Sequence, residues 1–119
     1  MATIPQSLNE LLTCDGAMCC AVVDAESGMM LGSAGTGVDL EIAAAGNTEV
    51  VRAKQKVMRD LGLDDVIDDI LITLGTQYHL IRPSSRKEGT FVYFVLDKSK
   101  SNLALARRKM QEVDKNLTF

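Results

Sequence analysis

The chain has 119 residues, of which 46% are hydrophobic and 24% are charged, and its formal net charge is -3. This composition excludes a disordered chain, which has few apolar residues and a high net charge. The length suits one hydrophobic core, so we expect a single domain over residues 1–119. The acidic balance argues against nucleic acid as a partner, because nucleic-acid binding needs a concentrated basic surface.

Neither secretion nor membrane insertion is expected. The first residues lack the positive charges and the long apolar run of a signal peptide, and nowhere do about 18 apolar residues follow one another. We therefore expect a cytoplasmic protein with no membrane partner. The three cysteines, Cys14, Cys19 and Cys20, are odd in number and lack paired C-x-x-C spacing, which indicates free thiols rather than a disulfide framework or a metal site.

In chain order, the first predicted element is a short helix over about residues 5–13, whose leucines recur at helical spacing. The apolar run Met18–Val23 predicts a strand that is buried on both faces. Asp24–Gly28 has the composition of a tight turn, and Met29–Ser33 resumes an extended apolar segment. These segments predict a β-hairpin.

A long helix is predicted from Asp39, a favourable N-cap, to about Leu61, which precedes a glycine. Three strands follow, and the last is rich in the β-branched and aromatic residues that suit a half-buried sheet surface. The final helix has one apolar stripe and a polar side that is expected to face solvent. The three strands are Ile70–Leu74, Tyr78–Arg82 and Thr90–Leu96, the stripe is Leu103, Ala106, Met110, Val113 and Leu117, and the polar side is Arg107, Arg108, Gln111, Asp114 and Lys115.

The order of these elements predicts an α+β fold with five strands and no internal repeat, because strands and helices do not alternate as they do around a parallel sheet. The long helix carries more apolar surface than a sheet can cover. One stripe is expected to dock on the sheet, and a second, beside it, needs another cover, for which a second copy of the chain is the simplest candidate. The first stripe is Leu40, Ala44, Val51 and Met58, and the second is Ile42, Ala43, Gly46, Val50, Ala53, Val57 and Leu61.

Alanine is also a good helix former and needs no partner, but glycine costs about 1 kcal/mol relative to alanine inside a helix. Gly46 therefore favours a close helix–helix contact over mere helix propensity.

No catalytic or cofactor-binding set is found, so we expect no enzyme activity and no cofactor. His79 lies in a predicted strand without a neighbouring nucleophile. The pairs Asp64–Asp65 and Asp68–Asp69 lack the spacing of a calcium loop. We interpret this segment as a solvated turn in which Asp68 and Asp69 are charged residues at an exposed strand edge, an edge at which a partner could also pair. The glycines between residues 32 and 37 precede a helix whose first turn is acidic, which disfavours phosphate.

Three segments carry a resemblance to the roadblock family, named for a dynein light chain, that spans about residues 16–117. They are the hairpin Val22–Met29, the long alanine-rich helix, and the block Val95–Lys98 followed by Ser101–Arg107, which is the most specific. The resemblance implies a profilin-like five-stranded antiparallel sheet, with the long helix on one face and the two terminal helices on the other.

The resemblance also implies a homodimer in which two long helices pack together and two central strands join. On this sequence the implied interface residues are Ala43, Gly46, Val50, Ala53 and Val57, with Ile70 and Ile72 in the joining strand Ile70–Leu74. Family members act as scaffolds, as dynein subunits, or as regulators and partners of Ras-like GTPases, including bacterial proteins of gliding motility.

The sequence thus predicts a non-catalytic homodimeric adaptor that binds a small Ras-like GTPase or its complex. An alternative from another class is a small-molecule sensor with a pocket between sheet and helix, for which the adaptable side chains of Met18, Met29, Met30 and Met58 are candidates.

Overall fold

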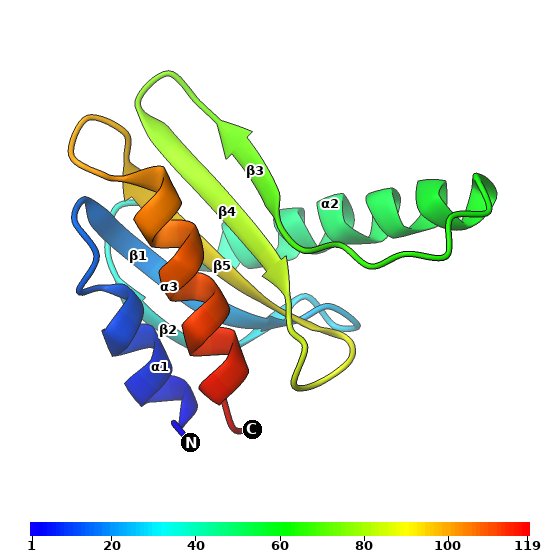
Figure 1. The fold of residues 1–119 in the computed structure, drawn as a ribbon, viewed down its shortest axis with the longest axis horizontal. Helices are drawn as coiled ribbons and strands as arrows, with labels where there is room; N and C mark the ends of the chain where they lie inside the picture. The colour runs from blue at the N-terminus through cyan, green and yellow to red at the C-terminus, as the bar shows by residue number, and fades with distance from the viewer.

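The backbone forms five strands and three helices in the predicted order, as seen in a computed structural model that describes residues 1–119 (Figure 1). None of the three helices combines the length and the apolar character that crossing a bilayer requires. The elements are α1 (Ile4–Leu11), β1 (Ala17–Asp24), β2 (Met29–Gly35), α2 (Leu40–Asp60), β3 (Ile70–Thr73), β4 (Gln77–Pro83), β5 (Thr90–Asp97) and α3 (Leu103–Asn116).

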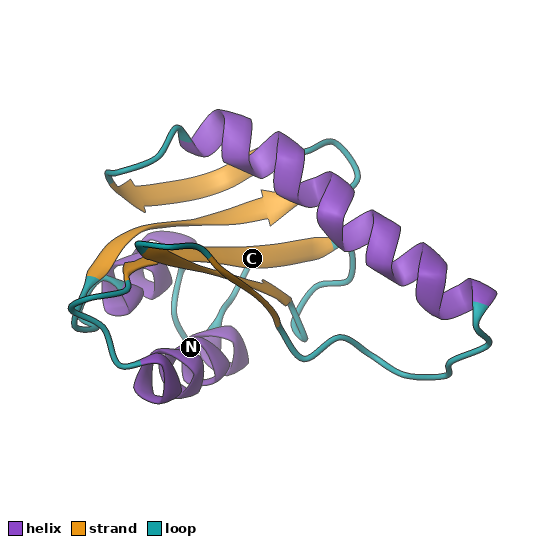
Figure 2. Ribbon diagram, turned by 90° about the horizontal axis from the view of Figure 1, so that it is seen from above, coloured by secondary structure: helices purple, strands orange, loops and turns teal.

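All five strands join one antiparallel sheet in the order β2-β1-β5-β4-β3. Short turns connect β1 to β2, β3 to β4 and β4 to β5, so β1 and β5 meet in the middle and β2 and β3 become the edges. The helix α2 covers one face, and α1 and α3 cover the other (Figures 1 and 2). The predicted fold class is confirmed.

The core has two halves, one on each face of the sheet. Neighbouring residues of β1 alternate between them, since Cys20 belongs to the half under α1 and α3 and Cys19 to the half under α2. The prediction of a strand buried on both faces is therefore confirmed for β1. The prediction of a half-buried surface for β5 is wrong, because β5 is the central strand and Phe91 to Leu96 are covered by helices on both sides.

Each helix begins at a polar side chain that accepts hydrogen bonds from the first free backbone N–H groups. The Thr3 side chain accepts from Gln6 N and the Gln6 side chain accepts from Thr3 N, which forms a capping box. The Asp39 carboxylate caps α2 by accepting from the N–H groups of Glu41 and Ile42, and Asn102 caps α3. These caps set where the helices start relative to the strands.

The two ends of the chain lie together on the face that carries α1 and α3 (Figure 1). Ala2 N donates to Asn116 O at 2.7 Å, and Thr118 N donates to Ala2 O at 2.8 Å.

At the end of β2, Gly35 has φ of 81°, and a Cβ added there would lie 2.3 Å from the carbonyl oxygen of Met18. Only glycine allows this close approach of β2 to β1.

Candidate interaction surface

The helix α2 presents an apolar stripe to solvent. Ile42 is 72% exposed, Val50 36%, Val57 46% and Leu61, at the C-cap, 65%. Gly46 lies in the same stripe, and a Cβ added to it would meet no atom within 4 Å. The stripe predicted from the sequence is therefore not sheltered by its own subunit.

Only the first half of α2 rests on the sheet. Its buried residues are Ala44, Thr48 and Val51, and no residue from 52 to 60 is buried. In Figure 2 the second half of the helix extends past the sheet. The expectation that the stripe ending at Met58 docks along its whole length is wrong, because the helix axis leaves the sheet before Met58 is reached.

The five α2 residues assigned to the interface are separated by three, four, three and four positions. This is the spacing at which one helix presents a seam to another helix. Ala43 is half-buried, and the other four residues are exposed. Ile70 and Ile72 lie in β3, where both are half-buried and Ile70 packs against the core under α2. The far edge of β3 pairs with no strand.

His79 lies in β4 directly opposite Ile72 of the edge strand. Its Nε2 is 2.8 Å from Gln77 Oε1, and its Nδ1 is 2.9 Å from the Tyr93 hydroxyl. A neutral ring that donates from Nε2 and accepts at Nδ1 satisfies both contacts. Burial lowers the pKa of His79 and raises the pKa of Tyr93 to about 12. His79 is thus a half-buried strand residue with two structural hydrogen-bond partners.

The return segment, residues 61–69, runs from the end of α2 back to β3, and its four aspartates divide into two kinds. Asp64 and Asp65 are exposed and form no ion pair. Asp68 Oδ1 accepts from Arg82 Nη1 at 2.8 Å, and Asp69 accepts two hydrogen bonds from the Arg107 guanidinium at 3.0 and 3.1 Å. Asp68 and Asp69, interpreted as charged residues at a strand edge, directly precede the edge strand β3, and arginines distant in sequence bind them and anchor the segment, which the sequence did not predict.

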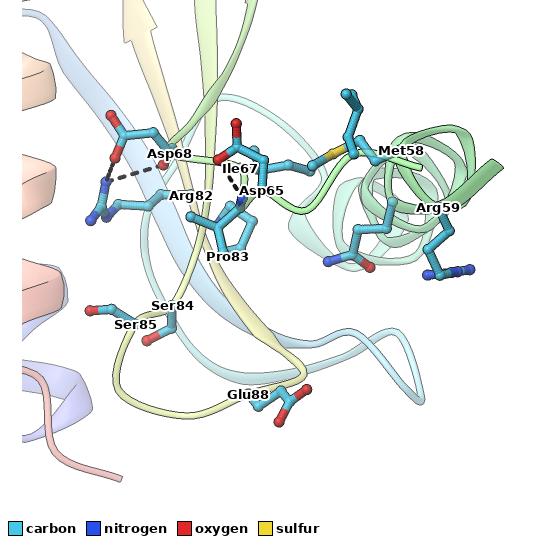
Figure 3. Close-up of a pocket in the computed structure, with 13 residues that line it drawn as sticks. Met58, Arg59, Asp65, Ile67, Asp68, Arg82, Pro83, Ser84, Ser85 and Glu88 are labelled. Carbon is cyan, nitrogen blue, oxygen red and sulfur yellow. Dashed lines mark hydrogen bonds and ion pairs between the residues drawn. The ribbon is translucent and has the colours of Figure 1, made fainter. Parts of the chain in front are cut away.

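A cleft of about 490 Å³ opens between α2, the return segment and the β4–β5 hairpin (Figure 3). Gln55, Met58 and Arg59 form the helix wall. The second wall is residues 63–68 of the return segment except Asp64, and the third is Arg82 to Ser85 with Glu88. A second cavity of about 530 Å³ shares Met58 and the return segment but reaches Val50 and Ile70 instead of the hairpin. The return segment is therefore the common wall of both.

Behind the cleft lies a carboxylate that the sequence placed on the solvent side of α3. Asp114 is fully buried. It accepts hydrogen bonds from Arg82 Nε at 3.2 Å, from the hydroxyls of Ser84 and Ser85 at 2.6 and 2.7 Å, and from Ser85 N at 3.0 Å. The expectation for Asp114 is wrong because the β4–β5 hairpin folds over α3 at this position. Burial alone would raise the pKa of Asp114, but these hydrogen bonds lower it.

The glycine-rich connection before α2 and the three cysteines were also considered as chemical sites, and their surroundings in the structure do not favour such a role. The start of α2 next to the glycine-rich connection is occupied by its own Asp39 carboxylate, which already accepts two of the free N–H groups. Cys14, Cys19 and Cys20 are free. Burial raises the pKa of Cys20 to about 12, which keeps its thiol protonated at neutral pH and makes it a poor nucleophile.

The four methionines considered for a ligand pocket do not share one. Met58 lines the cleft and the second cavity, Met18 lies at a separate hollow near Gly75, and Met29 and Met30 lie near the start of α2. Met29 is 67% exposed. The structure therefore spreads these side chains over the molecule.

The antiparallel order β2-β1-β5-β4-β3, with one long helix on one face and two terminal helices on the other, is the arrangement that the resemblance to the roadblock family implied. No protein-family model matches the sequence, and no curated protein matches it either. Solved structures, however, match nearly the whole chain, which confirms the resemblance at the level of the fold.

Three of these structures come from bacteria. A Roadblock/LC7 domain from Streptomyces avermitilis is 11% identical, with a TM-score of 0.81 over 96% of this chain and 93% of that chain. MglB from Myxococcus xanthus is 16% identical, with a TM-score of 0.82 over 94% and 89%. The gliding protein MglB from Thermus thermophilus is 15% identical, with a TM-score of 0.79 over 94% and 83%.

Proposed function

We propose that this chain is a non-catalytic, cytoplasmic adaptor that forms a two-fold homodimer through α2 and β3, and that the dimer binds a small Ras-like GTPase. The observation that carries the dimer is the uncovered α2 stripe with its 3-4-3-4 spacing. The GTPase is supported by the resemblance to the roadblock family and by the structural likeness to a gliding protein.

The part of α2 that extends past the sheet, called the overhang below, suggests where the second copy lies. The distal half of the helix extends past the sheet in the region of the unpaired edge strand β3, where the return segment leads back to it (Figures 1 and 2). A second chain pairing along that edge would lie under the overhang and could cover it. The two-fold relation would give each subunit the same cover.

The estimated free energies indicate that both α2 and β3 contribute to the proposed dimer. Full burial of one large apolar side chain is worth about 1.5–3 kcal/mol. The four in the stripe, Ile42, Val50, Val57 and Leu61, are on average about half exposed. Two subunits therefore gain roughly 7–13 kcal/mol from the stripes, which is comparable to the roughly 4–15 kcal/mol that association costs. Hydrogen bonds and apolar contacts along β3 supply the surplus in this proposal.

Another MglB structure, 15% identical with a TM-score of 0.80, is described as having a tetrameric arrangement. Self-association in a protein of this fold supports the same property here. The assigned interface residues remain Ala43, Gly46, Val50, Ala53, Val57, Ile70 and Ile72.

Sedimentation velocity at tens of micromolar tests the dimer. The wild type should sediment as a dimer, and the double variant A53K/V57K should be a monomer with an unchanged circular dichroism spectrum, because both residues are exposed in the subunit. Gln55→Lys adds the same kind of charge on the other side of α2 and should leave the dimer intact. A monomeric wild type would remove the basis of the proposal.

The GTPase is tested separately, with purified Ras-like GTPases loaded with GDP or with a non-hydrolysable GTP analogue. Calorimetry should show that the dimer binds one nucleotide state more tightly, and that A53K/V57K binds more weakly. Absence of binding to every GTPase in both states would contradict this part while leaving the dimer standing.

A further inference from the structure

The cleft of Figure 3 carries two carboxylates that form no ion pair within the chain, although Asp65 Oδ1 accepts a hydrogen bond from Val66 N at 2.8 Å. Asp65 lies on the return-segment wall and Glu88 lies on the hairpin wall, so the two approach the cleft from different sides. Both are exposed, and neither forms an ion pair. Arg59, on the helix wall, is the only cation of the cleft without a carboxylate.

The second cation of the cleft does not offset this charge. Arg82 donates to Asp68 on its open side and to the buried Asp114 behind it, so one guanidinium is shared by two carboxylates. The side chain of Arg82 is only 16% exposed. The lining of the cleft therefore holds three carboxylates, of Asp65, Asp68 and Glu88, against two guanidinium groups, of Arg59 and Arg82, and so favours a cationic partner.

Apolar side chains lie between the charged walls. Met58 and Ile67 are half-buried, while Leu63 is 53% exposed and Val66 is 84% exposed. Val66 is exposed even though Arg82 and Arg107 anchor the same segment at Asp68 and Asp69. Apolar groups rimmed by like charges mark a surface for a partner of opposite charge.

Part of the cleft wall lies away from the α2 stripe, although Met58 and the return segment also border the second cavity, which reaches Val50 and Ile70. At about 100° per residue, Gln55 and Arg59 each lie roughly 160° around the helix from Val57. The stripe and this part of the cleft wall thus lie on opposite sides of α2, and pairing of two α2 helices leaves Gln55 and Arg59 free.

We propose that the cleft of Figure 3 docks a basic amphipathic segment of a partner protein. Lysine or arginine side chains of that segment pair with Asp65 and Glu88, and its apolar side chains pack on Met58, Leu63 and Val66. A volume of about 490 Å³ has room for several side chains but not for a folded domain. The inference goes beyond the proposed dimer and GTPase, since it concerns a separate surface that a helix-in-groove contact fits.

Fluorescence anisotropy with a defined probe tests this site. The probe is a fluorescein-labelled amphipathic peptide of leucine and lysine, about 14 residues long, and its counterpart carries glutamate in place of lysine. The lysine peptide should bind the full-length chain saturably, and the glutamate peptide should not. The affinity should fall at least about tenfold in D65K/E88K, whereas D15K, which changes an exposed aspartate elsewhere, should alter it less than about twofold.

Two further measurements keep the result independent of folding and of the dimer. D65N/E88Q removes the charges at nearly constant shape and should also weaken binding. In amide chemical-shift mapping, the lysine peptide should perturb residues 63–68 and the hairpin at Glu88. Equal affinity for wild type and D65K/E88K, or perturbations confined to the stripe around Val50 and Val57, would overturn the proposal. Sedimentation of D65K/E88K should still show a dimer, which separates failure of this site from failure of the proposed function.

Discussion

Replacing Asp114 by alanine tests the network that joins α3 to the β4–β5 hairpin. The variant deprives Arg82, Ser84 and Ser85 of a fully buried acceptor. Removing one partner of a buried ion pair costs about 3–5 kcal/mol. Arg82 keeps Asp68 at 2.8 Å, so we expect a loss near the lower end of that range, about 3 kcal/mol. For a chain of this length the melting temperature should fall by roughly 12 °C.

The pH dependence sharpens this prediction. The folded-state pKa of Asp114 lies below its unfolded value, so its stabilisation is present above about pH 4 and is lost as the pH falls through the folded value. Urea denaturation of wild type and Asp114→Asn should therefore differ most near pH 7, and the difference should shrink below about pH 4. Asp15→Ala serves as an exposed control. A loss below about 1 kcal/mol in the alanine variant at neutral pH would refute the reasoning, since surface substitutions reach about half of that.

Three more variants test single features of the fold. Gly35→Ala should destabilise the chain by about 2 kcal/mol or more in urea, because its Cβ would lie 2.3 Å from the Met18 carbonyl oxygen at a positive φ; a loss under half of that would contradict the close approach. Gly46→Ala, made in the A53K/V57K background, should stabilise the subunit by about 1 kcal/mol, since a Cβ meets nothing there; destabilisation would show an unseen contact. The folded-state pKa of His79 is lowered, so the wild type should lose stability as the pH falls below about 6.5, and His79→Gln should lose less between pH 7 and 5; parallel losses would rule out His79 as the cause.

Local signals explain why most of the fold could be predicted from the sequence. Asp39 and the glycine after Leu61 marked both ends of α2, and the turn residues after β1 marked the first hairpin. The alternation of Cys19 and Cys20 between two halves of the core follows directly from strand geometry. Each of these features depends on neighbours within a few residues.

The features that were missed depend on residues distant in sequence. Arg107 lies 38 residues from its partner Asp69, and Asp114 lies 29 to 32 residues from the hairpin groups that bind it. On a helical wheel Asp114 lies about 20° from Leu103, at the border of the apolar stripe, and the fold of the hairpin over α3 completes its burial. The cleft was missed for the same reason, because its three walls come from separate parts of the chain.

The meeting of the two chain ends, where Ala2 lies between Asn116 and Thr118, has a practical consequence for measurements. A tether or a fluorophore attached at either end would start from the same corner, on the face of the sheet opposite α2. The protein can therefore be immobilised by either end with the stripe directed away from the support. An end-to-end linker of a few residues could also close the chain into a ring, and the ring should be more resistant to unfolding because its unfolded state has less conformational freedom.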